Sequence, residues 1–569
     1  MCGICGGNDQ DRDYEGALHL IGHRGPDGYK IRLFSDVTLG FCRLSIIDLS
    51  DIAMQPMSSD DGRIHIVFNG EIYGYKKLRD ALRKGGRYDF RTKSDTEVIL
   101  AMYLLYDEKF VNYIDGMFSI VIYDERKDQL LLYRDRAGIK PMYYYLANGK
   151  FLFASELKAI KSMLRPDEIR TDTSALYDFF SYGYVPEPKS IYKNIHKLKP
   201  ANCLVYDLKA HRIKRYYQYW KLNINTSERS GRKIEDVQDE YRYLVNKSIK
   251  EQLVSDVPVG IFFSGGVDSS IIALEALRDH SNIKSYSIGF EAKSFSEAPF
   301  IEKYAKQIGI ANELEILGME DIRGRLYDTY PEWFDEPYDD LTALPAYLLS
   351  KHAVKDVKVA LSGDGNDELF GGYVAHQGYY EWERRGIRNR FKYAIEKNIP
   401  NSEVKDLMSG LLFYAAFFGC VPDRYRKINK KRLGLPEDYD EYWFLRDAWN
   451  STLPPYTRAR YADFRTYLLG DILPKTDRSS MAASLEVRVP FLSRELIEFA
   501  FSLASEDCNK LGELKGMVKG AYQGKLSEEL LGRKKHGFTV PYQYIKSTKL
   551  RGPYRRYNLF LDFWKERLI

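Results

Sequence analysis

The fold of the larger part of this chain is decided by the stretch Val257-Pro258-Val259-Gly260-Ile261-Phe262-Phe263-Ser264-Gly265-Gly266-Val267-Asp268-Ser269-Ser270. Residues 257–263 form a short apolar run, which is typical of a buried strand. Residues 264–268 predict a loop, and residues 269–278 predict a helix. A second strand-like segment follows at residues 283–290. This strand–helix–strand alternation predicts a parallel α/β sheet.

The loop of this stretch has the composition of an anion site. Glycines let the backbone approach a phosphate chain closely, and successive N–H groups at a helix N-terminus bind anions. Asp268 would repel phosphate by itself, so we interpret it as a Mg²⁺ ligand. The loop lacks the lysine of a Walker P-loop and resembles the PP-loop of ATP pyrophosphatases; a plain Gly-Gly turn is the alternative for so short a motif. The residues expected at ATP are Ser264, Gly265, Gly266, Asp268, Ser269 and Ser270.

A second loop downstream decides between these alternatives. It reads Leu361-Ser362-Gly363-Asp364-Gly365-Asn366-Asp367-Glu368-Leu369-Phe370-Gly371-Gly372-Tyr373. Its two neighbouring acids could be a solvated turn, but the whole string resembles the second ATP-site motif of the asparagine synthetase family. The resemblance implies that Ser362, Gly363 and Asp364 lie at the nucleotide. It also implies that Asp367 is a second Mg²⁺ ligand and that Tyr373 lies beside the reacting centre.

The resemblance continues towards the C-terminus. Residues 477–482 and 485–492 match further motifs of the family, and the similarity extends to residues 537–541. Lys515 stands where the family has a lysine that neutralises the departing pyrophosphate, and Lys519 is the second candidate. For either lysine the alternative is an exposed helix residue.

At the other end of the chain, Cys2 follows Met1 directly. Removal of Met1 would free an α-amine, whose pKa of about 7.7–8.0 allows it to accept the thiol proton near neutral pH. Position 2 could instead simply hold a small residue. Cys2 and Cys5 also form a Cys-x-x-Cys pair, but a redox or zinc site needs a context that is not evident nearby. We therefore expect Cys5 to be packed in the core.

Four segments that follow Cys2 resemble class II glutamine amidotransferases in order and spacing. They are His23–Gly28, Arg43–Asp48, Phe68–Tyr73 and Ser94–Glu97. The resemblance implies an αββα N-terminal-nucleophile hydrolase domain that hydrolyses glutamine at Cys2.

The residue types in these segments suit the chemistry of glutamine. Its carboxylate needs a cation, for which Arg43 matches the family position, and its ammonium needs acids, for which Glu71 and Asp95 match. The tetrahedral oxyanion needs fixed donors, which Asn69 and the N–H of Gly70 would supply. Taken singly, a surface salt bridge for Arg43 or Asp95 and a tight turn for Asn69-Gly70 are the better explanations. Together, and in register with Cys2, these residues indicate a glutaminase site.

The chain as a whole is predicted to be an α/β multidomain protein. We expect the glutaminase domain at residues 1–207 and a polar, irregular linker at residues 208–233. Residues 234–569 would form a parallel α/β PP-loop domain of the adenine nucleotide alpha hydrolase-like kind, with a helical extension. The elements expected in the first part are a helix over 95–106 with Ser94 or Asp95 as its N-cap and strands at 118–123, 129–133, 142–146 and 150–154.

Composition narrows the class of protein. The 85 basic and 80 acidic residues leave a net charge of only +5, without the concentrated basic face of a nucleic-acid binder. The apolar run 411–421 is shorter than a membrane span, and no signal peptide is evident. Six scattered cysteines do not resemble a disulfide framework, so a cytoplasmic setting is expected.

The family resemblance implies a glutamine-dependent, ATP-consuming amidation. A carboxylate would form an acyl-adenylate with release of pyrophosphate, and ammonia passed through an interior tunnel would displace AMP. We expect aspartate as the acceptor, held around residues 334–345; the alternative is another carboxylate such as a uronic acid in surface polysaccharide biosynthesis. ATP and Mg²⁺ are the expected cofactors, and a homodimer is a family expectation.

Two other classes of protein compete with this interpretation. A degenerate binding or scaffold relative would be expected to lack Cys2, Asp268 or Asp367, and all three are present. A phosphoribosyl- or hexosamine-forming amidotransferase could share the glutaminase half, but it would not need the 264–270 loop. Release of AMP and pyrophosphate separates our interpretation from both.

Overall fold

The fold was analysed in a computed structural model of the full chain. The structure describes residues 1–225, 231–386, 390, 392, 395, 404–418, 423–508, 513–533, 540–541 and 564–565. Lys534–His536, most of the motif at 537–541 and Cys420 therefore lie outside the described residues. Within the described part, none of the helices combines the length and the apolar character needed to cross a membrane.

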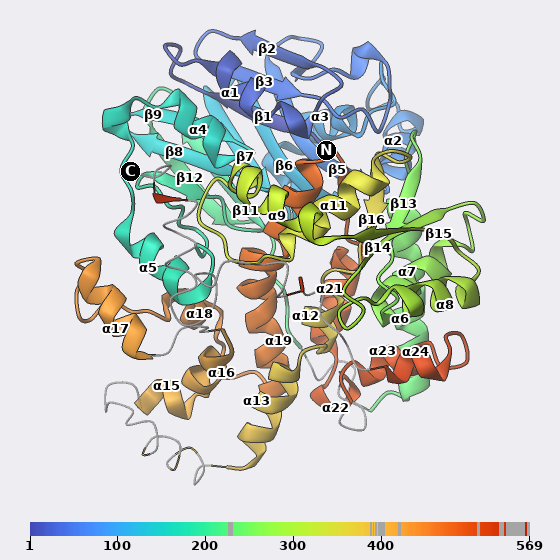
Figure 1. The fold of residues 1–569 in the computed structure, drawn as a ribbon. Coiled ribbons are helices and arrows are strands. Elements are labelled where there is room, and N and C mark those ends of the chain that lie inside the picture. The colour runs from blue at the N-terminus through green and yellow to red at the C-terminus, as the bar shows by residue number, and fades with distance from the viewer. Residues whose placement is uncertain are drawn as a thin grey trace.

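The N-terminal part contains two six-stranded antiparallel sheets that face each other (Figure 1). The first sheet has the order β10-β8-β9-β1-β3-β2, and the second has the order β12-β11-β7-β6-β5-β4. The strands of the first sheet are β1 (Gly3–Gly7), β2 (Tyr29–Leu33), β3 (Thr38–Cys42), β8 (Tyr143–Ala147), β9 (Lys150–Ala154) and β10 (Ile195–Lys197). Those of the second are β4 (Met57–Ser58), β5 (Ile64–Tyr73), β6 (Asp115–Asp124), β7 (Gln129–Arg134), β11 (Asn202–Asp207) and β12 (Arg212–Gln218).

Helices cover the outer faces of both sheets. Helices α1 (Tyr14–Leu20) and α4 (Leu157–Met163) pack on the first sheet, and α2 (Tyr75–Lys84) and α3 (Asp95–Tyr106) lie on the side of the second. The predicted αββα arrangement is therefore confirmed. Helix α3 has the predicted bounds, and its N-cap is Ser94, whose side chain accepts a hydrogen bond from the Thr96 N–H.

One stretch that we predicted to be irregular is a strand. Residues 212–218 form β12, which pairs with β11 along the edge of the second sheet. Most of its side chains are exposed or half-buried, so the sequence shows no apolar alternation there. The prediction of an irregular segment was wrong at this point, whereas the division of the chain into domains stays a prediction.

The C-terminal part is built on a parallel five-stranded sheet of order β15-β14-β13-β16-β17, as predicted. Its strands are β13 (Val259–Phe262), β14 (Lys284–Phe290), β15 (Ala311–Leu317), β16 (Val359–Leu361) and β17 (Glu486–Arg488). The chain moves from β13 outward to β15 and then returns to the other side of β13 with β16. The carboxyl ends of β13 and β16 thus flank a topological switch point, where ligands bind in open α/β sheets.

Helices surround this sheet and extend away from it (Figure 1). Those near the sheet include α6 (Ile234–Gln252), α7 (Val267–Ala276), α8 (Ala298–Ile308), α11 (Ala343–Ala353), α20 (Leu473–Met481), α21 (Arg494–Ser502), α23 (Gly516–Ala521) and α24 (Glu528–Gly532). The helical extension includes α12 (Asn366–Phe370), α13 (Val374–Arg384), α15 (Val404–Met408), α16 (Leu411–Phe418), α17 (Asp423–Arg432), α18 (Trp443–Ala448), α19 (Pro455–Arg465) and α22 (Ser505–Cys508). A π-helical turn at Leu468–Ile472 leads directly into α20. The remaining helices described are α5 (Thr173–Tyr182), α9 (Met319–Asp328) and α10 (Tyr330–Trp333).

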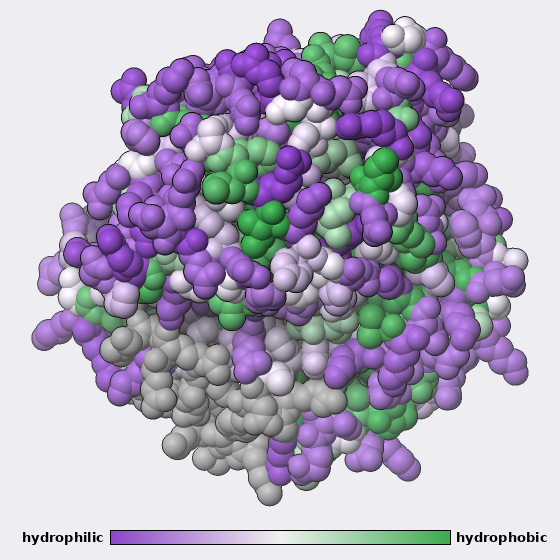
Figure 2. Space-filling view, turned by 90° about the horizontal axis from the view of Figure 1, so that it is seen from above, coloured by the Kyte–Doolittle hydropathy of each residue, from purple (hydrophilic) through white to green (hydrophobic). Residues whose placement is uncertain are grey.

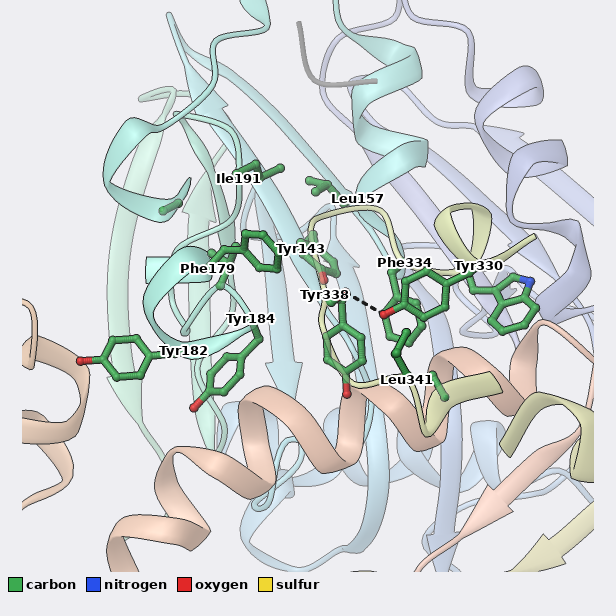
Figure 3. Close-up of a cluster of buried hydrophobic side chains, with 14 of the residues drawn as sticks. Tyr143, Leu157, Phe179, Tyr182, Tyr184, Ile191, Tyr330, Phe334, Tyr338 and Leu341 are labelled. Carbon is green, nitrogen blue, oxygen red and sulfur yellow. Dashed lines mark hydrogen bonds between the residues drawn. The ribbon is translucent and has the colours of Figure 1, made fainter. Parts of the chain in front are cut away.

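The two parts share a hydrophobic core. Tyr143 and Phe179 of the N-terminal part belong to the same buried cluster as Phe334 and Tyr338 of the C-terminal part (Figure 3). The rings of Phe334 and Tyr338 stack with centroids 4.2 Å apart, and the Tyr330 hydroxyl donates to the Tyr338 carbonyl. The face drawn in Figure 2 is mostly hydrophilic, with separate apolar groups among the polar side chains.

Candidate active sites

The residues expected to act on glutamine gather in one cavity. Cys2, Arg43, Gly70, Glu71 and Asp95 all line it, together with residues of the strands and loops around them. Although these residues come from separate segments, β1 pairs with β3 in the first sheet, and β5 of the second sheet contacts both strands. Asn69, the remaining predicted residue, is fully buried next to Gly70.

Asn69 holds the backbone of Cys2. Its side-chain oxygen accepts a hydrogen bond of 3.0 Å from the Cys2 N–H. Its Nδ2 is buried and makes no hydrogen bond within the described part of the chain. A buried donor without a partner is costly, so this amide is suited to meet a ligand oxygen. The Cys2 thiol itself lies 3.9 Å from the Leu44 carbonyl, and its burial raises the pKa of the thiol.

Gly70 cannot be replaced without moving the neighbouring strand. Its φ of +150° favours glycine, and a Cβ there would lie 2.0 Å from the Met117 carbonyl oxygen of β6. The backbone beside Asn69 is therefore fixed by close contact between β5 and β6, which is the kind of rigid support that an oxyanion donor needs.

Charged groups of both signs line the cavity. The Arg43 guanidinium donates to the Asp48 carbonyl and, at 2.8 Å, to the Ser50 carbonyl. Burial raises the pKa of Asp95 to about 6, although the Ile72 N–H donates to its carboxylate at 3.0 Å. Burial also raises the pKa of Glu71, against the opposing effect of Arg488. An incoming ammonium would relieve the cost of ionising these acids.

The two glycine-rich loops meet at the switch point of the parallel sheet. Because β13 and β16 are neighbours in parallel register, the loops that follow them leave from the same edge. A Cβ on Gly363 would lie 3.0 Å from the Cβ of Asp268, so the loops are in contact. The hydroxyl groups of Ser264 and Ser269 lie 3.2 Å apart across the first loop. The Ser270 N–H completes its turn by donating to the Gly266 carbonyl.

Lys515 joins both loops at this edge. Its Nζ lies 2.5 Å from Asp268 Oδ2 and 2.5 Å from Asp367 Oδ1. Asp268 also accepts a hydrogen bond of 2.6 Å from the Asn366 side chain. Burial acts to lower the pKa of Lys515, but the two carboxylates raise it by more, so this lysine stays charged. The second candidate, Lys519, is half-buried one turn further along α23.

The donor set at this edge fits Mg²⁺. Asp268 and Asp367 supply carboxylate oxygens from two loops, and Mg²⁺ takes one or two protein carboxylates together with substrate phosphates. A cluster of three or more His, Cys, Asp or Glu ligands is not found in the described part of the chain.

Two further predicted residues lie beside the second loop. The Asp364 carboxylate accepts hydrogen bonds from Ser362 at 2.9 Å and from Thr476 at 2.7 Å. The Tyr373 hydroxyl donates to Glu368. Burial raises the pKa of Tyr373, with Glu368 acting in the same direction.

Comparisons with known proteins agree with this geometry. Residues 1–218 match the glutamine amidotransferase domain family, and residues 240–557 match the asparagine synthase family. A glutamine-hydrolysing asparagine synthetase of Bacillus subtilis is 34% identical over 555 residues, which cover 94% of this chain and 85% of the relative. The chain belongs to the family of glutamine-hydrolysing asparagine synthetases. As a member of this family, the protein is an ATP-dependent ligase with glutamine as its nitrogen source.

A second relative is consistent with this assignment. A putative glutamine-hydrolysing asparagine synthetase of Methanocaldococcus jannaschii is 36% identical over 528 residues, which cover 86% of this chain and 100% of the relative. Among solved structures, a glutamine phosphoribosylpyrophosphate amidotransferase from B. subtilis has a TM-score of 0.30 at 16% identity, over 67% of this chain and 77% of that chain. A score this low carries no argument about function.

The sequence did not indicate a role at this cavity for Glu486, which lines it, or for Arg488, which lies next to it. Glu486 of β17 lines the cavity, and its carboxylate lies 2.8 Å from the Met1 ammonium. Arg488 lies 2.7 Å from Glu486 and 3.5 Å from Glu71. Burial acts to raise the pKa of Glu486, but the Met1 ammonium and Arg488 outweigh it and lower this pKa to about 2. The segment 485–492 was singled out as a family motif, but its sequence did not show that it reaches the other domain.

The segment expected to hold the acceptor is divided between two places. Asp335 lies 3.3 Å from Arg478 and 3.7 Å from Lys158, and Glu336 pairs with Lys197, so this half belongs to the interface between the two parts of the chain.

The other half of the segment faces the synthetase site. The Asp340 carboxylate lies 2.9 Å from Lys475, whose neighbour Thr476 donates to Asp364. Burial, with the nearby charge of Asp340, raises the pKa of Asp471 to about 7.

Proposed function

We propose that the protein converts aspartate to asparagine, with ATP cleaved to AMP and pyrophosphate and with nitrogen taken from glutamine. The observation that carries the proposal is the position of Lys515 between Asp268 and Asp367 at the switch point, in the same chain as the Cys2 cavity. Such a cluster suits a pyrophosphate that leaves with Mg²⁺, which a glutaminase alone would not need.

Glutamine hydrolysis would begin at Cys2 after removal of Met1. Arg43 would hold the substrate carboxylate, and Glu71 and Asp95 would hold its ammonium. The free α-amine of Cys2 would accept the thiol proton, and the thiolate would attack the amide carbonyl. The buried Asn69 Nδ2 and the Gly70 N–H would stabilise the oxyanion, a donor pair whose single members are typically worth about 10²–10³ in rate.

The acceptor carboxylate would attack the α-phosphate of ATP to give an acyl-adenylate. The 264–270 loop, with Ser362 and Gly363, would bind the nucleotide. Asp268 and Asp367 would hold Mg²⁺, which when bound supplies positive charge to the phosphate oxygens. Lys515 would move from these carboxylates to the leaving pyrophosphate. Asp364 and Tyr373 would lie at the acyl centre, where ammonia displaces AMP.

The surroundings of Asp340 support an amino-acid acceptor. Lys475 offers a cation for a carboxylate, and Asp340 and Asp471 offer anions for an ammonium. A uronic acid has a carboxylate but no ammonium, so it would make no use of the negative charge of these acids. Ammonia transfer through an interior tunnel, a cytoplasmic location and a homodimer stay predictions.

The test is a product balance. Purified protein would be incubated with glutamine, Mg-ATP and aspartate, and pyrophosphate, AMP, glutamate and asparagine would be quantified. Equal amounts of pyrophosphate and asparagine that depend on aspartate would support the proposal. Pyrophosphate that forms only with a uronic acid or its nucleotide sugar would reject aspartate as the acceptor. A Cys2→Ala variant should make asparagine with ammonium chloride but not with glutamine, which assigns the nitrogen source to Cys2.

A further inference from the structure

A buried arginine lies directly behind the proposed nucleophile. The Arg24 guanidinium is fully buried, and its Nε donates to the backbone carbonyl of Cys2 at 3.3 Å. Its Nη1 also lies 2.8 Å from Glu156, a residue of the same domain. Because Arg24 contacts the peptide unit of Cys2 itself, any change in the plane of its guanidinium changes the support of the thiol.

The geometry of Arg24 is fixed from the other domain. Asp477, in the middle of α20, accepts from Nη1 at 2.8 Å and from Nη2 at 3.1 Å. This is a bidentate pair with both partners buried, and such pairs fix orientation as well as supplying energy. Asp477 also lies 3.6 Å from Lys140.

We propose that Asp477 is a positioning residue for glutamine hydrolysis: it holds Arg24, and through Arg24 it holds Cys2. The inference rests on the proposed reaction at Cys2. With this role for Asp477, the glutamine site is incomplete without α20, a helix of the synthetase half. The bidentate pair then supports glutamine hydrolysis as well as holding the two domains together.

The same helix contacts the proposed synthetase site through the residue that precedes Asp477. Thr476 donates to Asp364 at 2.7 Å, and Lys475 pairs with Asp340 at 2.9 Å. Consecutive residues of α20 therefore contact the proposed acceptor site and the support of the nucleophile. A shift of α20 when aspartate and ATP bind would move Asp477 and hence Arg24. Glutamine hydrolysis is then expected to respond to occupation of the synthetase site.

The test uses Asp477→Asn in the full-length protein. Glutamine hydrolysis is measured without ATP, and asparagine formation is measured with ammonium chloride in place of glutamine. We expect kcat for hydrolysis to fall by up to about 10²-fold, because misplacement of a catalytic group by about 1 Å has that effect. KM for glutamine should change little, since Arg43, Glu71 and Asp95 do not contact Asp477. Ammonia-dependent synthesis should persist, which shows that the variant folds.

Asp178→Asn is the matched control. Asp178 is also buried and also links the two parts of the chain, accepting from Lys189 at 2.7 Å, Tyr439 at 2.8 Å and Trp443 at 3.1 Å. It lies on α5, beside α17 of the helical extension (Figure 1). This variant should hydrolyse glutamine at the parent's rate. A kcat for Asp477→Asn equal to that of Asp178→Asn would overturn the proposal.

A double-mutant cycle isolates the route through Arg24 from the contact with Lys140. If Asp477 acts through Arg24, then Asp477→Asn should have no further effect on hydrolysis in an Arg24→Gln background. Additive losses would overturn the proposal. If the unmodified protein itself fails to hydrolyse glutamine, the proposed function fails instead, and the two failures are thereby distinguished.

Discussion

At the scale of single residues, Lys515 has an unusual environment for a cation. It is buried, its φ of +57° is left-handed, and its ammonium touches two carboxylates from different loops. A non-glycine residue in this region of φ needs strong local support, which the two ion pairs supply. The arrangement keeps a positive charge at the point where phosphate would arrive.

Replacement of this lysine should separate the two activities. Lys515→Met removes the cation that would stabilise the leaving pyrophosphate, so pyrophosphate release with ammonium chloride as nitrogen source should fall by about 10²–10³-fold. Glutamine hydrolysis should persist, because the Cys2 cavity does not include Lys515. Lys519→Met, the comparison on the same helix, should retain pyrophosphate release. If the second variant loses it and the first does not, the two lysines have been assigned the wrong way round.

Asp95 predicts a pH dependence of glutamine binding. Its pKa is raised by burial to about 6, so its carboxylate takes up a proton as the pH falls through that value. Protonation removes the charge that would hold the substrate ammonium. KM for glutamine should therefore rise between about pH 7 and about pH 5. Steady-state measurements of glutamine hydrolysis across this pH range give the KM at each pH. An Asp95→Asn variant should have a higher KM with a weaker pH dependence, and a flat KM in the parent would exclude this role for Asp95.

The residue types of these sites were predictable, but some of their partners were not. Arg43, Glu71 and Asp95 were predicted because they match the glutamine-binding positions of the amidotransferase family and suit a ligand with one carboxylate and one ammonium. They line one cavity with Cys2. Glu486 and Asp477 could not be chosen in this way. The contact of Asp477 with Arg24 spans 453 positions of sequence, and no local pattern encodes such a contact.

At the scale of elements, the spacing of apolar residues predicted helices and strands correctly where one face of the element is buried. Helix α3 and strand β9 have the predicted bounds. The exposed strand β12 was missed because an edge strand has no apolar face to detect. The pattern could also not show that the two glycine-rich loops touch, since their contact follows from the parallel pairing of β13 and β16.

The contact of these loops with α23 leaves no space for a side chain at Gly372. A Cβ there would lie 1.6 Å from Asp367 Oδ1 and 2.4 Å from Lys515 Cε. Gly372→Ala should therefore displace the carboxylate and the lysine together and abolish pyrophosphate release. It should also lower the free energy of unfolding by about 1–3 kcal/mol, as overpacking does. Glutamine hydrolysis without ATP should survive.

The control for this element is Gly532→Ala at the end of α24, where a Cβ would meet nothing within 4 Å. This variant should keep both activities and its stability. Pyrophosphate release by Gly372→Ala at the parent's rate would show that Asp367 and Lys515 are not needed in their observed positions. Pyrophosphate assays and urea unfolding measure the two effects separately.

At the scale of the whole molecule, the two parts are joined by buried apolar contacts and by buried charges. Figure 3 shows side chains of both parts in one cluster, and the Met1 ammonium reaches Glu486 across the boundary. Buried apolar contacts between domains restrict their relative motion. Strand and helix patterns predicted each part separately, but they contain no information on which surfaces of the two parts meet.

A shared core predicts that the two parts unfold together. Phe334 is buried and stacks on Tyr338 within this core, so Phe334→Ala should lower the free energy of unfolding by about 3–5 kcal/mol. Tyr243→Ala is the control, since Tyr243 is 66% exposed on α6 and its loss should change stability little.

Glutamine hydrolysis and tryptophan fluorescence would be followed through urea unfolding of each protein. In the parent both probes should report one transition, and in Phe334→Ala both should shift to lower urea by the same amount. Loss of hydrolysis at a urea concentration where the fluorescence transition has not begun would mean that the glutaminase part unfolds by itself, and that the buried cluster does not couple the two parts.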